Sequence, residues 1–236
     1  MSSDLSALLS ATFYEAGDEH RVELIHQRDR AARRRLASLD LAVYDPEGKN
    51  LTAVPLDTHQ EILDLGTLVG PVAAGRPRVM VLLDARYEEQ IFPYRPHHYG
   101  FLHRRGSTTA ALYYAVNAVL GGVPDRIGAT GLNNFETYIF LREAFAERYS
   151  VLLGNPARFS TAEAQVTAYY ATGRLTQVVA LAPKAHREVA LTSEHAGERL
   201  QRVEIKALFR LASYVVGRRA DSGELVLFDH LFSYHR

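Results

Sequence analysis

A stretch without any charged residue runs from Gly106 to Pro124, in the middle of the chain. Leu112, Val116 and Val119 recur within it at the i, i+4, i+7 spacing of one helix face. A serine near its start suits a helix N-cap, and a Gly-Gly pair near its end suits a helix stop. Because Ala, Tyr and Asn occupy the other faces in place of Lys or Glu, the pattern predicts a helix of about 14 residues that is buried on most sides.

Segments with strand-like patterns precede and follow this predicted helix. Residues 39–56 and 164–181 each read as a hairpin, because apolar positions alternate on both sides of a short turn-forming sequence. Residues 57–77 carry several glycines and prolines, which favours a short helix followed by a loop. Further strands are predicted at 78–87, 127–141 and 148–154, with a helix over 141–153 as the alternative for the last of these.

The two ends of the chain carry different patterns. Residues 4–37 read as a polar helix, in which the arginines at 28–35 form either a solvated face or an anion-docking patch. Residues 196–216 fit either an amphipathic helix or a strand that pairs with residues 224–232. We see no internal repeat. The prediction is a single domain over 1–236, with a helical extension at 1–37, a core at 38–182 and a C-terminal extension at 183–236.

Composition and charge exclude several classes of function. Lys+Arg and Asp+Glu both number 27, so the net charge is zero and the chain carries no overall electrostatic footprint for nucleic acid. The chain has no cysteine, which removes disulfides, thiolate nucleophiles and Cys-bearing metal sites. Since it also lacks a signal-peptide pattern and any apolar run of about 18 residues, we expect a cytoplasmic protein without membrane contact.

The order of the predicted elements is two strands, an apolar helix and several antiparallel strands. The segment RVMVLLDARYEEQIFPYRPHHYGFLHRRGSTTAALYYAVNAVLGG and the following AQVTAYYATGRLTQVVALA resemble the strand, His-containing loop, central helix and closing strands of hotdog-fold acyl-thioester enzymes. The resemblance covers about residues 78–182 and implies an α+β fold, in which a curved antiparallel sheet wraps around one apolar central helix. It also implies a homodimer and a substrate carried on coenzyme A or an acyl carrier protein. Many family members have a carboxylate on the central helix, and this helix has none.

Candidate site residues gather in and around the loop before the predicted helix. His97 and His98 are candidate catalytic acid/base residues, because imidazole titrates near neutral pH. Glu136 is the nearest carboxylate that could act as a base. Candidate substrate-binding residues offer either a guanidinium for an anionic group or hydrogen bonds for a carbonyl. They are Arg95, His103, Arg104, Tyr113, Asn117, Asn133 and Asn134.

Three hypotheses for the function follow from these residues. The first is a small-molecule biosynthetic enzyme, of thioesterase or acyltransferase type, acting on an acyl or aromatic carbonyl substrate by His-based acid/base chemistry without metal, nucleotide or other cofactor. The second is a secondary-metabolite cyclase or condensing enzyme with Glu136 as its base. The third is a non-catalytic ligand- or partner-binding protein. The first two require His, Asn and Glu side chains to line one pocket, and the third does not.

Overall fold

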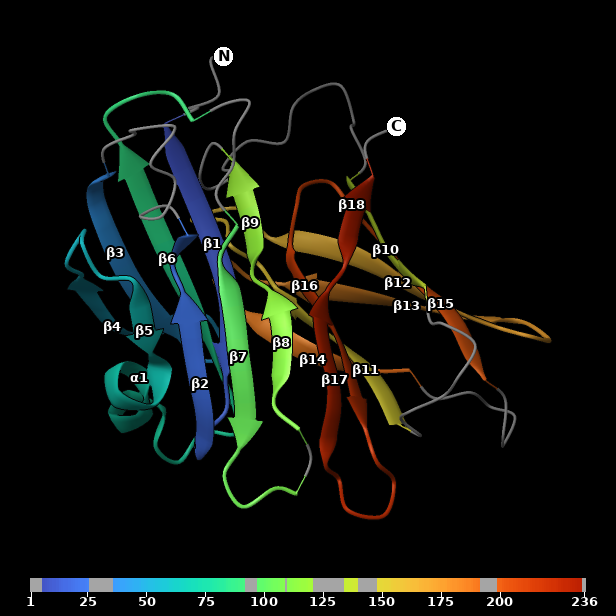
Figure 1. Cartoon of the computed structure of the whole chain (residues 1–236). Helices are drawn as coiled ribbons and strands as arrows, with labels where there is room; N and C mark the ends of the chain where they lie inside the picture. Colours follow the sequence, from blue (N-terminus) through green and yellow to red (C-terminus); the bar gives the residue numbers. More distant parts are fainter. Residues whose placement is uncertain are drawn as a thin grey trace. The chain divides into compact units, whose positions relative to one another are not determined.

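The protein is seen here as a computed structural model that divides into two compact units, Met1–Val123 and Pro124–Arg236. The structure describes residues 6–25, 36–91, 97–108, 110–120, 134–139, 148–191 and 199–234. Antiparallel strands make up nearly all of the described secondary structure, with one short helix (Figure 1).

The first unit contains a five-stranded and a four-stranded sheet. In spatial order the five-stranded sheet is β4 (Asn50–Pro55), β3 (Leu36–Tyr44), β6 (Val79–Tyr87), β1 (Ala7–Tyr14) and β9 (Asn117–Leu120). The four-stranded sheet is β5 (Ile62–Asp64), β2 (Asp18–Glu23), β7 (Tyr99–Arg104) and β8 (Leu112–Ala115). Thr12 of β1 and Tyr114 of β8 are hydrogen bonded across the two sheets, so the inner faces of these sheets meet.

The second unit also contains a five-stranded and a four-stranded sheet. The five-stranded sheet is β13 (Arg174–Leu181), β12 (Ala162–Tyr170), β15 (Leu200–Ala207), β10 (Asn134–Ile139) and β18 (Phe232–Tyr234). The four-stranded sheet is β14 (His186–Ala190), β11 (Arg148–Gly154), β16 (Ala212–Arg218) and β17 (Leu225–His230).

The two units have the same strand order. Strands β10 to β18 take, one by one, the places of β1 to β9 in both sheets. The five-stranded orders β4-β3-β6-β1-β9 and β13-β12-β15-β10-β18 correspond, as do the four-stranded orders β5-β2-β7-β8 and β14-β11-β16-β17. The sequence shows no repeat because topology depends on where apolar strands and turns fall, whereas the identities of the side chains can diverge.

Local sequence explains the elements of the first unit. All eight positions of β1 are buried, whereas β2 alternates between buried and exposed positions as a strand with one solvated face does. The single described helix, α1 (Leu65–Ala73), begins at Asp64, whose Oδ1 accepts a hydrogen bond from the Thr67 N–H at 3.0 Å. The β3–β4 hairpin turns through Gly48, whose φ of +90° favours glycine.

The predicted buried central helix is wrong. Its segment forms β8 and β9, which are separated by Val116 alone and which belong to different sheets. β8 pairs with β7, and β9 pairs with β1, so the chain crosses from one sheet to the other at this point. Leu112, Val116 and Val119 do have the spacing of one helix face. Here that spacing arises because the chain changes sheets between β8 and β9, which shifts the two-residue alternation of the strands. The α+β, hotdog-like architecture is therefore replaced by antiparallel sheets without a helix at their centre.

The predicted N-terminal helix is wrong as well. Residues 7–14 and 18–23 form β1 and β2, and the arginines at 28–35 lie outside the described residues. The segment looked polar because β2 exposes every second residue, and a polar helix and a half-exposed strand have similar compositions.

Other predictions are confirmed. The hairpins expected at 39–56 and 164–181 are the pairs β3–β4 and β12–β13. The strands expected at 78–87 and 148–154 are β6 and β11, and the short helix expected within 57–77 is α1. For the ambiguous tail the strand alternative holds, because β16 pairs with β17. Of the strand expected at 127–141, the structure describes residues 134–139 as β10.

No helix among the described residues is both long enough and apolar enough to cross a membrane.

Candidate functional site

Two of the predicted site residues lie in the interior of the first unit. His98 and Asn117 each expose only 1% of their surface. The carbonyl of His98 accepts a hydrogen bond from the Val116 N–H at 2.8 Å, and His98 Nδ1 accepts one from the Ile25 N–H at 3.3 Å. Because Nδ1 accepts, it carries no proton in this arrangement. These bonds tie the segment before β7 to the end of β2 and to the β8–β9 crossover.

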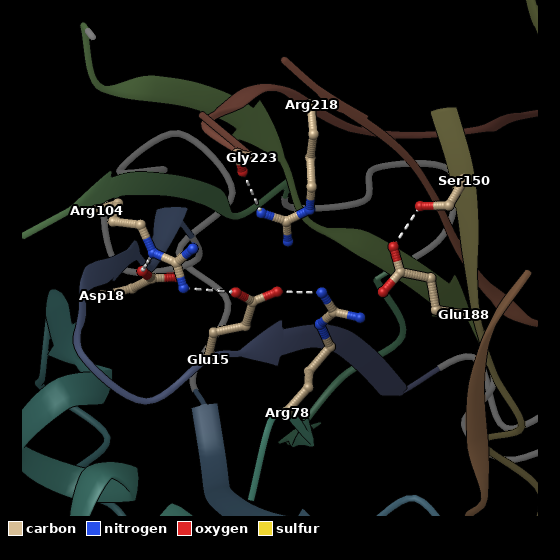
Figure 2. A network of polar contacts seen from close by, with 8 residues as sticks. All are labelled: Glu15, Asp18, Arg78, Arg104, Ser150, Glu188, Arg218 and Gly223. Atoms are coloured by element: carbon tan, nitrogen blue, oxygen red, sulfur yellow. Dashed lines mark hydrogen bonds and ion pairs between the residues drawn. The ribbon is translucent and has the colours of Figure 1, made fainter. Parts of the chain in front are cut away.

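Arg104, which was predicted to hold an anionic substrate, is engaged by carboxylates of its own chain. Its Nη2 lies 3.0 Å from Glu15 Oε2, and its Nε lies 3.3 Å from Asp18 Oδ1. Glu15 also forms an ion pair with Arg78, so two carboxylates and two guanidinium groups make one network (Figure 2). This ion-pair network links the β1–β2 turn to the start of β6 and the end of β7, so its role in the first unit is structural.

Tyr113 lies in a different environment from the one predicted for it. As part of a buried helix it would have pointed inward with Asn117, but in β8 the neighbouring Tyr114 points inward and Tyr113 points outward. Tyr113 is 62% exposed. The reason is the two-residue period of a strand, which places successive side chains on opposite faces of the sheet.

The outer side of the four-stranded sheet carries three neighbouring aromatic side chains, Tyr99, Phe101 and Tyr113, which we call the aromatic face. Phe101 is 43% exposed and lies directly opposite Tyr113 in the β7–β8 register. The rings of Tyr99 and Tyr113 are stacked, with centroids 5.2 Å apart and an interplanar angle of 9°. The strands that carry and flank this face, β2, β7 and β8, lie side by side in Figure 1.

Charged side chains border the aromatic face on β2 and β5. Arg21 lies opposite Phe101 on β7 and opposite Asp64 on β5, with its Nε 4.0 Å from an Asp64 oxygen. The Tyr113 hydroxyl donates to Glu23 Oε2 at 3.4 Å. The outer surface of this sheet therefore combines exposed aromatic rings with carboxylates.

His103 belongs to the same outer surface. It lies opposite Glu19 in the β2–β7 register, and its Nδ1 is 3.9 Å from Glu19 Oε2. Of the predicted site residues, the structure thus brings His103 and Tyr113 to one exposed surface, although not to a common pocket.

A buried polar chain lies beneath the aromatic face. Tyr114 Oη is 2.5 Å from Thr12 Oγ1 and 2.7 Å from His20 Nε2, and all three residues are almost completely buried. Burial lowers the pKa of His20 to about 3 and raises the pKa of the Tyr114 hydroxyl well above its usual value. Both groups are therefore neutral at pH 7, and neither reaches solvent.

Sequence reasoning missed His20 and Tyr114. The alternation of Asp18, His20 and Val22 with charged neighbours was the available signal for His20, but it was read as part of a polar helix. Tyr114 was missed because the predicted helix places Tyr113 inside, whereas the strand buries Tyr114. Gly100 makes room for the Tyr114 ring, because a Cβ at position 100 would lie 2.0 Å from Tyr114 Cε1.

For the remaining predicted residues, the structure gives no arrangement of side chains from which a site could be built. His97 is exposed in the segment before β7. Asn134 and Glu136 are residues of β10 in the second unit, opposite Ala207 and Ile205 of β15, and the structure describes their backbone only. Arg95 and Asn133 lie outside the described residues. Within the ranges that the structure covers, no group of three or more His, Cys, Asp or Glu side chains is arranged to hold a metal ion.

The sequence matches no protein-family model and no curated protein.

Proposed function

We propose that the protein is a non-catalytic binding protein and that the aromatic face of its first unit is the contact surface. The observation that carries this proposal is the placement of three adjacent aromatic side chains on the solvent side of one sheet, where Tyr113 is 62% and Phe101 43% exposed. The proposal corresponds to the third of the hypotheses formed from the sequence.

The aromatic face differs from an ordinary sheet surface. An antiparallel sheet with one solvated side usually carries polar residues there, and single exposed apolar side chains are common. Here the exposed aromatics adjoin one another through the strand register, which makes a contiguous patch. Contiguous exposed apolar patches mark interaction sites, and tyrosine supplies much of the binding energy of protein interfaces.

The described structure lacks the features on which the first two hypotheses depend. Both hypotheses start from a predicted central helix, and its segment forms β8 and β9. His98 and Asn117, which were expected to act on a substrate, are enclosed in the interior. A binding function needs none of these groups and uses the surface that is open.

Peptide and glycan arrays test the proposal. We expect wild-type protein to bind a subset of array positions and the double variant Phe101→Ser/Tyr113→Ser to lose them. Phe159→Ser is the matched control, since Phe159 is an 81% exposed aromatic residue of the second unit. Thermal melting of each variant checks the fold. If the double variant and the control bind the same positions as wild type, the aromatic face is not the contact surface and the proposal fails.

A further inference from the structure

The surface around the aromatic face is acidic. Glu19, Glu23 and Asp64 contribute three negative charges and Arg21 contributes one positive charge, so these four side chains sum to −2. The side chains of Glu19 and Asp64 are half exposed, at 50% and 51%. A partner that approaches the aromatic face therefore meets carboxylates at its edge.

A second tyrosine of the same chain shows what such an arrangement can bind. In the second unit the hydroxyl of Tyr169 donates to Glu204 Oε1 at 3.3 Å. The guanidinium of Arg202 lies 4.0 Å from the centroid of the Tyr169 ring and 3.9 Å from Glu204 Oε2. One guanidinium thus contacts both a tyrosine ring and the carboxylate to which that tyrosine is hydrogen bonded.

The aromatic face repeats the tyrosine–carboxylate half of this arrangement on an exposed surface. The Tyr113 hydroxyl donates to Glu23, as the Tyr169 hydroxyl donates to Glu204. Aromatic rings attract cations through their quadrupole, and guanidinium groups also stack on ring planes. Tyr113 is 62% exposed, and its ring is stacked on that of Tyr99, so the pair presents aromatic surface to solvent.

From this geometry we propose that the aromatic face binds an arginine-bearing segment of a partner protein, with a guanidinium over the tyrosine rings and beside Glu23. The inference rests on the proposed function and names its partner class. Arginine suits the site better than lysine, because its planar group contacts a ring and a carboxylate at once. An acidic segment would be repelled by the carboxylates, and a neutral saccharide would be indifferent to their charge.

The test is fluorescence anisotropy with a labelled peptide that alternates arginine and serine. Two matched peptides replace every arginine with glutamine or with glutamate, and a panel of soluble oligosaccharides serves as competitor. We expect the arginine peptide to bind most tightly and to weaken as salt rises, because exposed charges are screened. Tyr113→Ala and Glu23→Gln should each raise Kd about fivefold. Phe159→Ala and Glu163→Gln, at exposed positions of the second unit, are the matched controls and should leave Kd unchanged.

The outcomes separate this inference from the proposed function. If the arginine peptide binds no tighter than its glutamine counterpart, or binds equally well to the Glu23→Gln variant, the inference is overturned. If instead the glutamate peptide or an oligosaccharide binds in a way that Tyr113→Ala abolishes, the partner class is wrong while the aromatic face remains a contact surface. Loss of face-dependent binding in the arrays as well would remove both.

Discussion

Acidification should destabilise this protein through one buried histidine. His20 has a pKa of about 3 in the folded chain, against 6.5 for the ordinary side chain, because burial disfavours the imidazolium. Between these two values the unfolded chain binds a proton at His20 that the folded chain does not. The free energy of unfolding therefore falls as the pH drops below 6.5 and is fully retained above it.

The magnitude follows from the two pKa values. Lowering the pH from 7 to 5 protonates nearly all of the unfolded histidine and almost none of the folded one. Linkage then gives a loss of about 2 kcal/mol in the free energy of unfolding from His20 alone. This is a large part of the stability of a typical domain, which is about 5–15 kcal/mol.

Urea unfolding at pH 7 and at pH 5 measures this loss. The informative variant is His20→Gln, because the amide can still hydrogen bond to Tyr114 Oη but does not titrate. Its stability should fall by about 2 kcal/mol less than that of wild type over the same pH interval. Other titrating groups are common to both proteins and cancel in the difference.

His103→Gln is the matched control, since His103 is a partly exposed residue of the same sheet. It keeps the buried His20, so the loss of stability that His20 causes between pH 7 and pH 5 should persist. Equal losses in wild type and His20→Gln would refute the reasoning and place the acid-sensitive group elsewhere.

Three other substitutions test the packing and the polar contacts of the two units. Gly100→Ala should cost about 3 kcal/mol because the new Cβ meets the Tyr114 ring, and combining it with Tyr114→Ala should cost less than the sum of the two losses in urea melts. Asn155→Ala should cost about 3 kcal/mol, because the buried amide that donates to three backbone carbonyls is lost, and calorimetry should show a lower Tm. Arg78→Met should cost about 1–2 kcal/mol and make stability less dependent on salt, since Glu15 loses its ion pair with Arg78; an unchanged salt dependence would contradict a stabilising role for this ion-pair network.

Local signals explain which elements could be predicted from the sequence. The β12–β13 hairpin combines alternating apolar residues with a Thr-Gly turn, and both signals lie within one short segment. The β8–β9 segment has no such signal, because what decides its structure is pairing with β7 on one side and β1 on the other. Those partners are distant in the sequence, so a window that contains only Leu112, Val116 and Val119 favours a helix.

The candidate site illustrates the same limit. The loop histidines were chosen for their chemistry, but chemistry alone does not tell whether His98 faces a pocket or the backbone of Ile25. Tyr113 was selected for the wrong reason, since the helical reading placed it inside. Phe101 and Tyr99 were not selected, because exposed aromatics become visible as a surface only once the register of β7 and β8 is known.

The matching strand orders of the two units show that one arrangement of strands can carry two different sets of side chains. The corresponding strands β7 and β16 illustrate the difference. β7 keeps one side open and carries Tyr99 and Phe101 there, whereas β16 is buried on both sides from Ala212 to Gly217. The same place in the strand order is thus half exposed in one unit and buried in the other. What a sheet can contact is therefore decided by the residues that its strands carry and by what packs on them, so two units of equal topology need not share a function.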